Sequence, residues 1–326
     1  MPSAIRIEEL TKDYAVGFWR KRPYRALDHV SLSIESGEVF GFLGPNGAGK
    51  STTLKLLMQL IFPTSGRAEI LGRPVGDIGV KQRIGYLPEN PSFYDYLTAE
   101  ELLNYFGQLF GLSAADRRQR VSGLLDKVGL GAERRLQLRK FSKGMLQRVG
   151  IAQALLNEPE VVFLDEPMSG LDPLGRRDVR ALILELRDQG RTVFFSSHIL
   201  SDAESLCSRV AIVAGGRLAA TGRVSDLLAF EVRGWELVVD GLTPELLARV
   251  GPSVRRATEI SPGRYTLELS VEQSTAAIIS DLAAAGATVI SLNPLRSTLE
   301  DFFMQHVKAA GAGARATFAE GDRAGR

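Results

Sequence analysis

A glycine-rich run between an apolar segment and a helical one holds the residues whose spacing is most specific for chemistry. Residues 44–52 match the pattern G-x-x-x-x-G-K-[ST] in full. The run consists of Gly44, Pro45, Asn46, Gly47, Ala48, Gly49, Lys50, Ser51 and Thr52. Glycines let backbone N–H groups close around phosphates, and the N-terminus of the following helix adds partial positive charge. We expect a nucleotide phosphate site in which Lys50 reaches the β- and γ-phosphates and Ser51 binds Mg²⁺. The alternative is a glycine-rich turn with a solvated lysine.

Two adjacent carboxylates follow a second apolar segment. The run Val161–Leu164 has the character of a buried strand, and Asp165 and Glu166 come directly after it. Carboxylates at the end of a buried strand need a cation or a reactive water nearby. We therefore expect Asp165 to hold Mg²⁺ through water and Glu166 to polarise the attacking water. The alternative is a strand that ends in acidic turn residues.

The distance between these two motifs predicts a helical insert. Asp165 lies 115 residues after Lys50, whereas a single strand–helix–strand crossover needs about thirty. From about Thr98 to Asn157 the apolar residues recur with helical spacing, with Leu102, Leu103, Tyr105, Phe106 and Leu109 on one side of the first segment. We expect a helical subdomain at about residues 90–158.

The other apolar segments predict the sheet that positions these motifs. Ile5–Leu10 and Ala26–Ile34 alternate like paired strands, and Glu38–Leu43 ends in the glycine-rich run, before a helix over Lys50–Leu60. Strand-like runs return at 161–164, 192–196 and 210–213, with a helix over 175–189. This alternation is typical of an α/β fold with a largely parallel, buried sheet.

A second, smaller domain follows residue 230. The expected order is strand Trp235–Val239, helix Pro244–Val250, strands Val254–Ile260 and Arg264–Leu269, helix Val271–Ala285 and strand Thr288–Leu292. This βαββαβ order suggests an α+β ferredoxin-like unit, to which Ser297–Val307 adds a helix. The predicted domains are 1–228 and 229–308, and residues 309–326 form an Ala-, Gly- and charge-rich tail that we expect to be disordered.

Composition excludes several classes of protein. The 326 residues are enough for about two domains, and 44% hydrophobic with 24% charged residues is ordinary for a folded chain. A formal net charge of +2 gives no overall field that would draw the chain to nucleic acid. With Cys207 as the only cysteine, an intrachain disulfide is impossible, and a reducing cytoplasm fits. We find no signal peptide and no uninterrupted membrane-spanning segment.

The segment Phe141–Met145, shortly before the acidic strand, carries a family resemblance. In this position the sequence resembles the ATP-binding subunit of an ATP-binding cassette (ABC) transporter, and Phe141–Met145 resembles that family's signature motif in a divergent form. Lys143 and Met145 stand where the second glycine and the glutamine are usual. Ser142 and Gly144 are kept, and the resemblance implies that Ser142, Gly144 and Met145 bind nucleotide at a helix start. The alternative is that Ser142 only caps the helix.

Further matches follow in the order typical of the family. Residues 169–172 resemble the D-loop, so Asp172 is implied at the nucleotide and the opposing subunit. His198 resembles the switch histidine near the γ-phosphate; an ordinary histidine at a strand end is its alternative. Tyr14 fits the aromatic position that stacks on adenine, where Phe18 or Trp19 could substitute, and a packed hairpin aromatic is the alternative.

Glu89 departs from the family pattern. It stands in Ile84–Glu89 where the family typically has a glutamine that touches Mg²⁺ and relays to the membrane subunit. A carboxylate can bind a hard cation as well as an amide oxygen, so we expect Mg²⁺ dependence to be retained. In having this glutamate and the divergent signature, the sequence resembles the subgroup that works with ABC-2 type exporter membrane subunits.

The resemblance implies a P-loop NTPase ABC cassette with an accessory domain. The implied function is that of a subunit that binds ATP and Mg²⁺, hydrolyses ATP and powers an exporter with separate transmembrane permease subunits. Two such subunits, identical or paralogous, would bind ATP between them on the inner face of the membrane, with no nucleic acid. Two alternatives stay open: an ABC-type ATPase that acts on a ribosome or nucleic-acid complex, and a nucleotide sensor that does not hydrolyse.

Two further segments have competing interpretations. The expected loop 18–25 carries four basic residues, Arg20, Lys21, Arg22 and Arg25, beside two aromatic ones. A solvated hairpin tip is the ordinary interpretation, and contact with lipid headgroups or with the partner is the other. The helix that includes Leu299–Phe303 resembles a terminal helix of the subgroup, and simple packing or dimerisation is its alternative.

Overall fold

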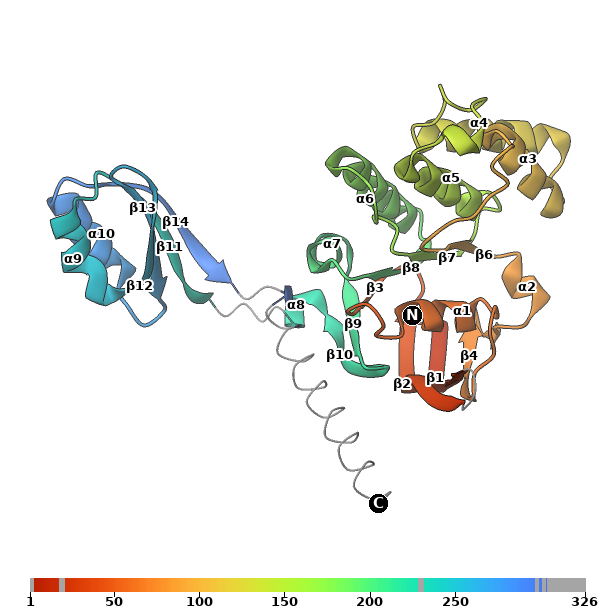
Figure 1. Ribbon diagram of the computed structural model, residues 1–326, viewed down its shortest axis with the longest axis horizontal. Coiled ribbons are helices and arrows are strands. Elements are labelled where there is room, and N and C mark those ends of the chain that lie inside the picture. The colour runs from red at the N-terminus through yellow and green to blue at the C-terminus, as the bar shows by residue number, and fades with distance from the viewer. Residues whose placement is uncertain (1–2, 18–20, 228–231, 297–298, 301–302, 304–326) are drawn as a thin grey trace, which may run out of the picture. The chain divides into compact units, whose positions relative to one another are not determined.

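The computed structural model describes residues 3–17, 21–227, 232–296, 299–300 and 303. These residues form two compact units, Met1–Val224 and Ser225–Phe302 (Figure 1). The predicted tail 309–326, most of the predicted helix 297–307 and the tip 18–20 of the expected basic loop lie outside the described residues.

A six-stranded sheet forms the centre of the larger unit. Its strands, in sheet order, are β10 (Arg217–Arg223), β9 (Arg209–Ala214), β3 (Val39–Leu43), β8 (Thr192–Ser197), β7 (Val161–Asp165) and β6 (Ile84–Leu87). All neighbours are parallel except β10 and β9. Every residue of β3, β7 and β8 is buried, which explains their continuous apolar sequences. The predicted largely parallel, buried sheet is confirmed.

A second, antiparallel sheet packs against the first through a shared core. Its strands, in order, are β2 (Arg22–Glu35), β1 (Ser3–Val16), β4 (Ser65–Ile70) and β5 (Arg73–Pro74). The core joins side chains of both sheets, such as Ile5 and Phe42, to Leu54 of α1 (Lys50–Leu57). The β1–β2 hairpin extends further than expected, so Arg22–Arg25 belong to a strand and the prediction of a loop over these residues is wrong.

Helices occupy the interval between the two sequence motifs. They are α2 (Ile78–Lys81), α3 (Ala99–Leu109), α4 (Ala114–Lys127), a 3-10 turn (Leu138–Lys140) and α5 (Lys143–Leu155). Thr98 and Glu101 form a capping box at the start of α3, and Ser113 caps α4. Figure 1 shows α3, α4 and α5 grouped together at one end of the larger unit. Beyond β7 follow α6 (Pro173–Asp188), α7 (Leu200–Leu206) and α8 (Val224–Leu227).

The smaller unit is an antiparallel sheet with two helices. Its elements are β11 (Val232–Asp240), α9 (Pro244–Val250), a 3-10 turn (Gly251–Ser253), β12 (Val254–Ser261), β13 (Arg264–Ser270), α10 (Thr275–Ala284) and β14 (Thr288–Arg296). The sheet order is β12-β13-β11-β14. Leu237 and Leu267 of the sheet pack with Leu246 of α9 and Leu282 of α10. Helix α10 begins at Thr275, later than the sequence predicts, because the Ser274 side chain caps it.

Candidate nucleotide site

A pocket of about 580 Å³ opens at the carboxyl ends of β3 and β7. It brings together residues from distant parts of the chain. Its lining consists of Tyr14, Tyr24, Ala26, Pro45, Asn46, Gly47, Gly49, Lys50, Ser51, Thr52, Glu89, Glu166, Ser169 and His198. Of the other residues predicted near this site, Gly44, Ala48 and Asp165 are buried and lie outside the lining. A concave, mixed polar and apolar site at this edge of a parallel sheet is a typical ligand position.

The phosphate loop connects β3 to α1 in a conformation that its glycines make possible. Gly47 and Gly49 have φ of 79° and 107°, a region that residues with side chains rarely adopt. A side chain at Gly49 would also collide with Ala26 and Leu27 of β2. The loop therefore lies directly against β2, and α1 begins where the loop ends, so the N–H groups of its first turn are available to an anion.

Lys50 and Glu166 form a nearly buried ion pair within the pocket. Lys50 Nζ lies 3.2 Å from Glu166 Oε1, and their side chains are only 6% and 8% exposed. The ammonium also donates to the carbonyl oxygens of Gly44, at 2.7 Å, and Pro45, at 3.3 Å. The second carboxylate oxygen of Glu166 lies 2.9 Å from His198 Nδ1. Glu166 is thus held between a cation and an imidazole, with its carboxylate facing the phosphate loop.

Asp165 lies deeper, beside the start of α1. Ser196 Oγ of β8 donates to Asp165 Oδ1 at 2.6 Å. Burial raises the pKa of Asp165, Glu166 adds to the rise, and hydrogen bonds from Ser196 and Ser51 together with Lys50 oppose it. The Ser51 hydroxyl and the Asp165 carboxylate are therefore neighbours.

The oxygen donors fit Mg²⁺ better than a metal that needs a protein cage. Ser51, Asp165 and Glu89 supply a hydroxyl and two carboxylates around the phosphate loop. Among the described residues no cluster of three or more His, Cys, Asp or Glu side chains could hold a metal alone. Mg²⁺ typically takes one or two protein ligands and completes its shell with phosphate oxygens and water.

Two tyrosines line the other end of the pocket. Tyr14 of β1 and Tyr24 of β2 are direct cross-strand partners, so their side chains lie on one face of the hairpin. Lys12 Nζ lies 5.2 Å from the centre of the Tyr14 ring. The sequence predicts Tyr14 but not Tyr24, because the basic residues 22–25 indicate a loop there, whereas the structure places them in β2. Strand alternation continued back from Ala26 would have placed Tyr24 on the same face as Ala26.

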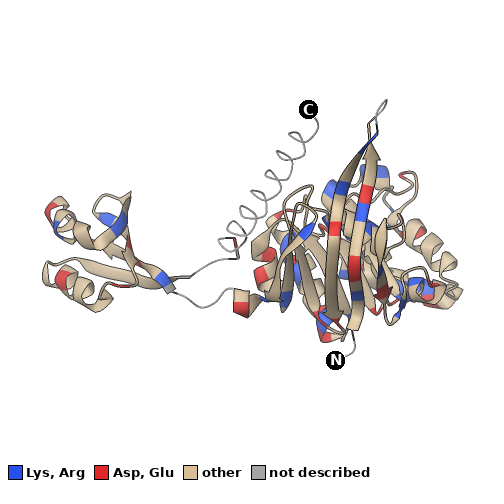
Figure 2. Ribbon diagram, turned by 90° about the horizontal axis from the view of Figure 1, so that it is seen from below, with Lys and Arg blue, Asp and Glu red and all other residues tan. Residues whose placement is uncertain are grey.

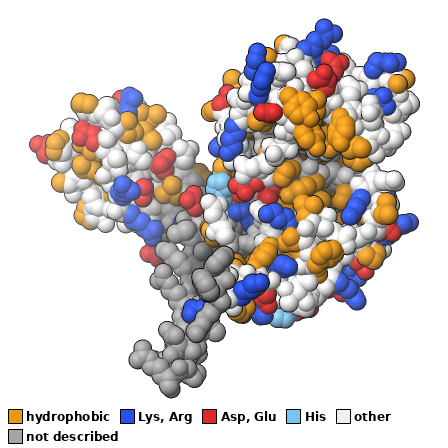
Figure 3. Space-filling view, turned by 45° about the vertical axis from the view of Figure 1, so that its right-hand side comes forward, with side chains coloured by type: hydrophobic (Ala, Val, Ile, Leu, Met, Phe, Trp, Pro, Cys, Tyr) orange, Lys and Arg blue, Asp and Glu red, His pale blue; other side chains and the backbone are white. Residues whose placement is uncertain are grey.

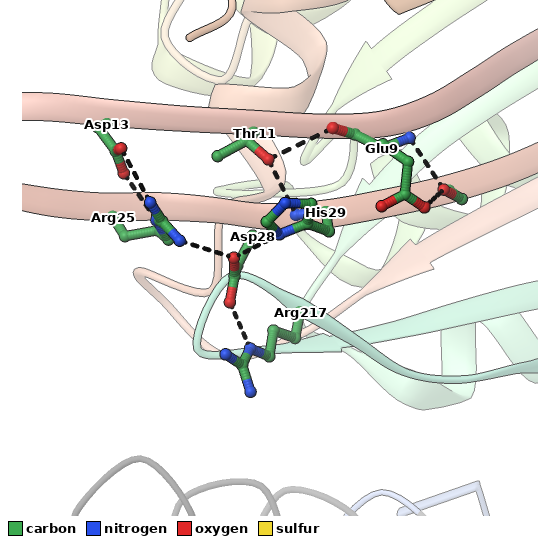
Figure 4. A network of polar contacts seen from close by, with 8 residues as sticks. Glu9, Thr11, Asp13, Arg25, Asp28, His29 and Arg217 are labelled. Carbon is green, nitrogen blue, oxygen red and sulfur yellow. Dashed lines mark hydrogen bonds and ion pairs between the residues drawn. The ribbon is translucent and has the colours of Figure 1, made fainter. Parts of the chain in front are cut away.

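A network of ion pairs fixes this hairpin beside the phosphate loop (Figure 4). Asp28 accepts hydrogen bonds from Arg25 at 3.1 Å and from Arg217 of β10 at 2.6 Å, and it lies 2.8 Å from His29 Nδ1. Arg25 also binds Asp13 with two nitrogens. Charged residues of both signs follow one another along β1 and β2 (Figure 2). Because the network joins β2 to β10, it helps to hold the hairpin, and with it the two tyrosines, beside the phosphate loop.

The signature and D-loop residues gather in a different pocket. This pocket, of about 460 Å³, is lined by Ser142, Lys143, Gly144, Arg148, Gly170, Leu171, Asp172, Leu174, Gly175 and Asp178. Ser142 caps α5 by accepting the Met145 N–H, and Asp172 caps α6 by accepting the Gly175 N–H at 2.7 Å. Met145 lines neither pocket, and its contact with a nucleotide stays a prediction.

Comparison with known proteins identifies the family. Residues 27–169 match the family model described as ABC transporter. An uncharacterized ABC transporter ATP-binding protein of Synechocystis is 46% identical over 311 residues, which cover 95% of this chain and 86% of that protein. The chain belongs to the ATP-binding proteins of ABC transporters. The phosphate loop and the two carboxylates at the end of β7 are thus parts of an ABC ATPase.

Two further relatives add detail. The bacitracin transport ATP-binding protein BcrA of Bacillus licheniformis is 41% identical over 221 residues, which cover 67% of this chain and 69% of that protein. A solved structure, described as the dimeric, post-hydrolysis state of the ATP-binding cassette MJ0796 bound to ADP and Pi, is 27% identical with a TM-score of 0.62. It covers 67% of this chain and 98% of its own. The ABC ATPase fold predicted from the sequence is confirmed.

An aromatic surface lies beside the nucleotide site of this ABC ATPase. A groove of about 350 Å³ runs between β6 and the helical segment, with Phe93, Phe106 and Phe110 in its lining. Next to it the rings of Tyr94, Tyr96 and Tyr105 pack against one another while remaining 42–60% exposed. We call the groove and these rings the aromatic surface. Figure 3 shows hydrophobic side chains grouped on a hollowed face of the larger unit.

In the part of the chain that the structure describes, no helix is both long enough and apolar enough to cross a bilayer.

Proposed function

We propose that this ABC ATPase powers an exporter, works as a dimer and docks onto separate transmembrane subunits. The observation that carries the proposal is the cluster of Lys50, Glu166 and His198 beside the phosphate loop. Its three groups have the charges that phosphoryl transfer to water requires: a cation for the phosphates, a base for the water and an imidazole at the transferring group.

The ion pair suggests how the base becomes available. ATP phosphates that enter the loop take Lys50 away from Glu166, which leaves the carboxylate free to accept a proton from water. The water oxygen then bonds to the γ-phosphorus while the bond to the β–γ bridging oxygen breaks, and the water proton moves to Glu166. His198 Nδ1, 2.9 Å from Glu166 Oε2, keeps the carboxylate oriented.

Mg²⁺ would complete the site. Ser51 and Asp165, with Glu89 at the rim, are the residues that would hold it. When bound, the ion would neutralise charge on the β- and γ-phosphates. Glu89 is exposed and makes no hydrogen bond or ion pair with the part of the chain that the structure describes, so its carboxylate is free to turn toward the ion.

The two separate pockets support a dimer. Ser142 and Gly144 offer a hydroxyl and a helix N-terminus but do not line the pocket that contains Lys50. In a head-to-tail pair, the signature pocket of one copy would cover the phosphates held by the other. The MJ0796 cassette, described as dimeric, supports this arrangement. The second copy would be the same chain or a paralogue.

The aromatic surface is the proposed docking place for the membrane subunit. Exposed aromatic groups around a groove are typical of protein–protein interfaces. The surface borders the segment that contains Glu89, so a docked partner would touch the loop that reaches the nucleotide. The bacitracin transport protein supports export as the direction, and docking would hold this chain at the inner face of the membrane.

The test is to isolate the complex in its ATP-bound state. We expect the tagged Glu166→Gln chain, solubilised gently from membranes with ATP and Mg²⁺, to copurify with a polytopic membrane protein in stoichiometric amount. It should bind ATP as a dimer and hydrolyse it at least ~100-fold more slowly than the original chain. Glu245→Gln, the same change at an exposed position of α9, should hydrolyse ATP at the normal rate.

Two results would contradict parts of the proposal separately. Normal hydrolysis by the Glu166→Gln chain would remove Glu166 from its role. Copurification with ribosomes or DNA, or recovery without any membrane protein, would contradict the proposal that the chain works with transmembrane subunits.

The docking place is tested separately. A Tyr94→Ser, Tyr96→Ser double variant should lose the membrane partner but keep its own ATPase rate. Phe62→Ser, at a similarly exposed apolar site elsewhere, should keep both.

A further inference from the structure

We propose that Gln147 is a positioning residue that links the signature helix α5 to the backbone of Glu166. The inference rests on the proposed role of Glu166 as the base and goes beyond it. In this proposal one buried amide couples the position of α5 to the position of the turn that carries Glu166.

Gln147 is buried and points from α5 at the turn that carries Glu166. The residue is only 1% exposed. Nε2 lies 3.4 Å from the carbonyl oxygen of Glu166 and 3.3 Å from that of Pro167. Among the described residues of α5, it is the side chain with a hydrogen bond to this turn. A buried amide is retained in such a place only if its donors are used.

The Glu166 backbone needs to be held. Its φ is 50°, in the left-handed region that residues other than glycine adopt rarely and at an energetic penalty. On one side, the Glu166 N–H donates to Ser196 Oγ at 3.0 Å, and Ser196 is fully buried in β8. On the other side, the Glu166 carbonyl accepts from the Ser169 N–H at 3.0 Å and from Gln147.

These anchors belong to different parts of the unit. Ser196 lies in the central sheet, where β7 and β8 pair directly from Val161↔Thr192 to Asp165↔Ser196. Gln147 lies on α5, which packs against β6 near its C-terminal end and carries the signature residues at its N-terminal end. The orientation of Glu166 therefore depends on where α5 lies relative to the sheet, and Gln147 carries that dependence.

The consequence is a link between two nucleotides. Helix α5 begins with the signature residues Ser142 and Gly144, which in the proposed dimer face the nucleotide of the other copy. A 13-residue helix transmits a shift of its first turn to its second turn, where Gln147 lies. Because a displacement of about 1 Å at a reacting group can change a rate about 100-fold, a small shift suffices. Contact with the partner's nucleotide would thus set the base on this chain's own nucleotide.

The test is Gln147→Met, which keeps the length of the side chain and removes its donors. We expect kcat for ATP to fall roughly 10- to 100-fold, with KM for ATP and the affinity for ADP changed less than about twofold, because no nucleotide-binding group is altered. The control is Gln137→Met, which removes another Nε2 donor to a backbone carbonyl, that of Tyr96 at 3.2 Å. It should keep the original kcat.

A second measurement separates positioning from structure. In a Glu166→Gln background the base is already absent, so adding Gln147→Met should leave ATP-dependent dimer formation intact. Loss of the dimer there, a normal kcat for Gln147→Met, or a joint loss of kcat and ADP affinity would each overturn the inference. If instead Glu166→Gln alone hydrolyses normally, the proposed function of Glu166 has failed, which is a different outcome.

Discussion

The ion pair between Lys50 and Glu166 must open before a nucleotide phosphate can take the lysine. We therefore predict that Glu166→Gln binds ADP more tightly than the original chain does. ADP is the chosen ligand because hydrolysis cannot complicate the titration. EDTA is included so that a metal ion plays no part in the comparison.

The size of the effect follows from the geometry of the pair. The Glu166 carboxylate adds a Coulomb attraction to its contact with the Lys50 ammonium, whereas an amide oxygen keeps a hydrogen bond to the same cation and loses that attraction. In the Glu166→Gln chain the new side chain would still offer an amide oxygen near Nζ. The substitution therefore weakens the competing contact, now 3.2 Å long and nearly buried, by about 1 kcal/mol. This corresponds to a roughly fivefold lower Kd for ADP.

Isothermal titration at matched ionic strength measures this change. The control is Glu89→Gln, which removes one negative charge from the same pocket without touching Lys50. Its effect should be clearly smaller than fivefold, because an exposed charge is screened. An unchanged or weaker ADP affinity for Glu166→Gln would refute the competition between carboxylate and phosphate. Equal gains for both variants would reduce the effect to net charge.

Three more predictions concern the metal, packing and the thiol. Glu89→Gln should raise the Mg²⁺ concentration for half-maximal ATP hydrolysis several-fold, since it removes a charged ligand; an unchanged rate and Mg²⁺ dependence would remove Glu89 from the metal site. Gly85→Ala would drive a methyl group into the Ala154 carbonyl, so urea unfolding should show a free energy of unfolding lower by about 3 kcal/mol. Gly123→Ala, in open space on α4, should raise the free energy of unfolding by up to about 1 kcal/mol. Burial raises the pKa of the Cys207 thiol well above 9.0, and Glu38 adds to the rise, so native protein should resist thiol reagents at pH 8 and react once per chain after unfolding. Because the raised pKa keeps the thiol protonated in the folded state, Cys207 stabilises the folded state below pH 9, and this contribution is lost as the pH rises further. The difference in unfolding free energy between the original chain and Cys207→Ala, measured against pH, should show this loss.

Local motifs made most of the pocket predictable. The phosphate loop consists of a strand end, particular glycines and a helix start within a few residues, so a short stretch of sequence is enough to recognise it. Asp165 and Glu166 end an apolar strand, and parallel strands carry their carboxyl ends to one edge, which explains why two motifs 115 residues apart meet.

Long-range register was harder to predict. Tyr24 depends on the hairpin continuing past Ala26, and the basic residues of 22–25 suggested a loop although ion pairs such as Arg25–Asp13 hold them in a strand. Gln147 showed no signal, because its partners are backbone carbonyls that no sequence pattern marks. The spacing of Tyr105 and Leu109 gave an apolar side of α3, but periodicity does not tell whether a side faces the core or stays exposed, as both residues do.

The composition of the aromatic surface bears on how the transporter is assembled. Its exposed cluster is built from tyrosines, Tyr94, Tyr96 and Tyr105, rather than from aliphatic side chains. A phenol ring buries well against a partner, and its hydroxyl stays hydrated when no partner is present. A surface of this kind is stable in water and can also be buried against a partner. With the aromatic surface as the proposed docking place, the ATPase could fold before it meets its membrane subunit, and the two would not have to be made in a fixed order.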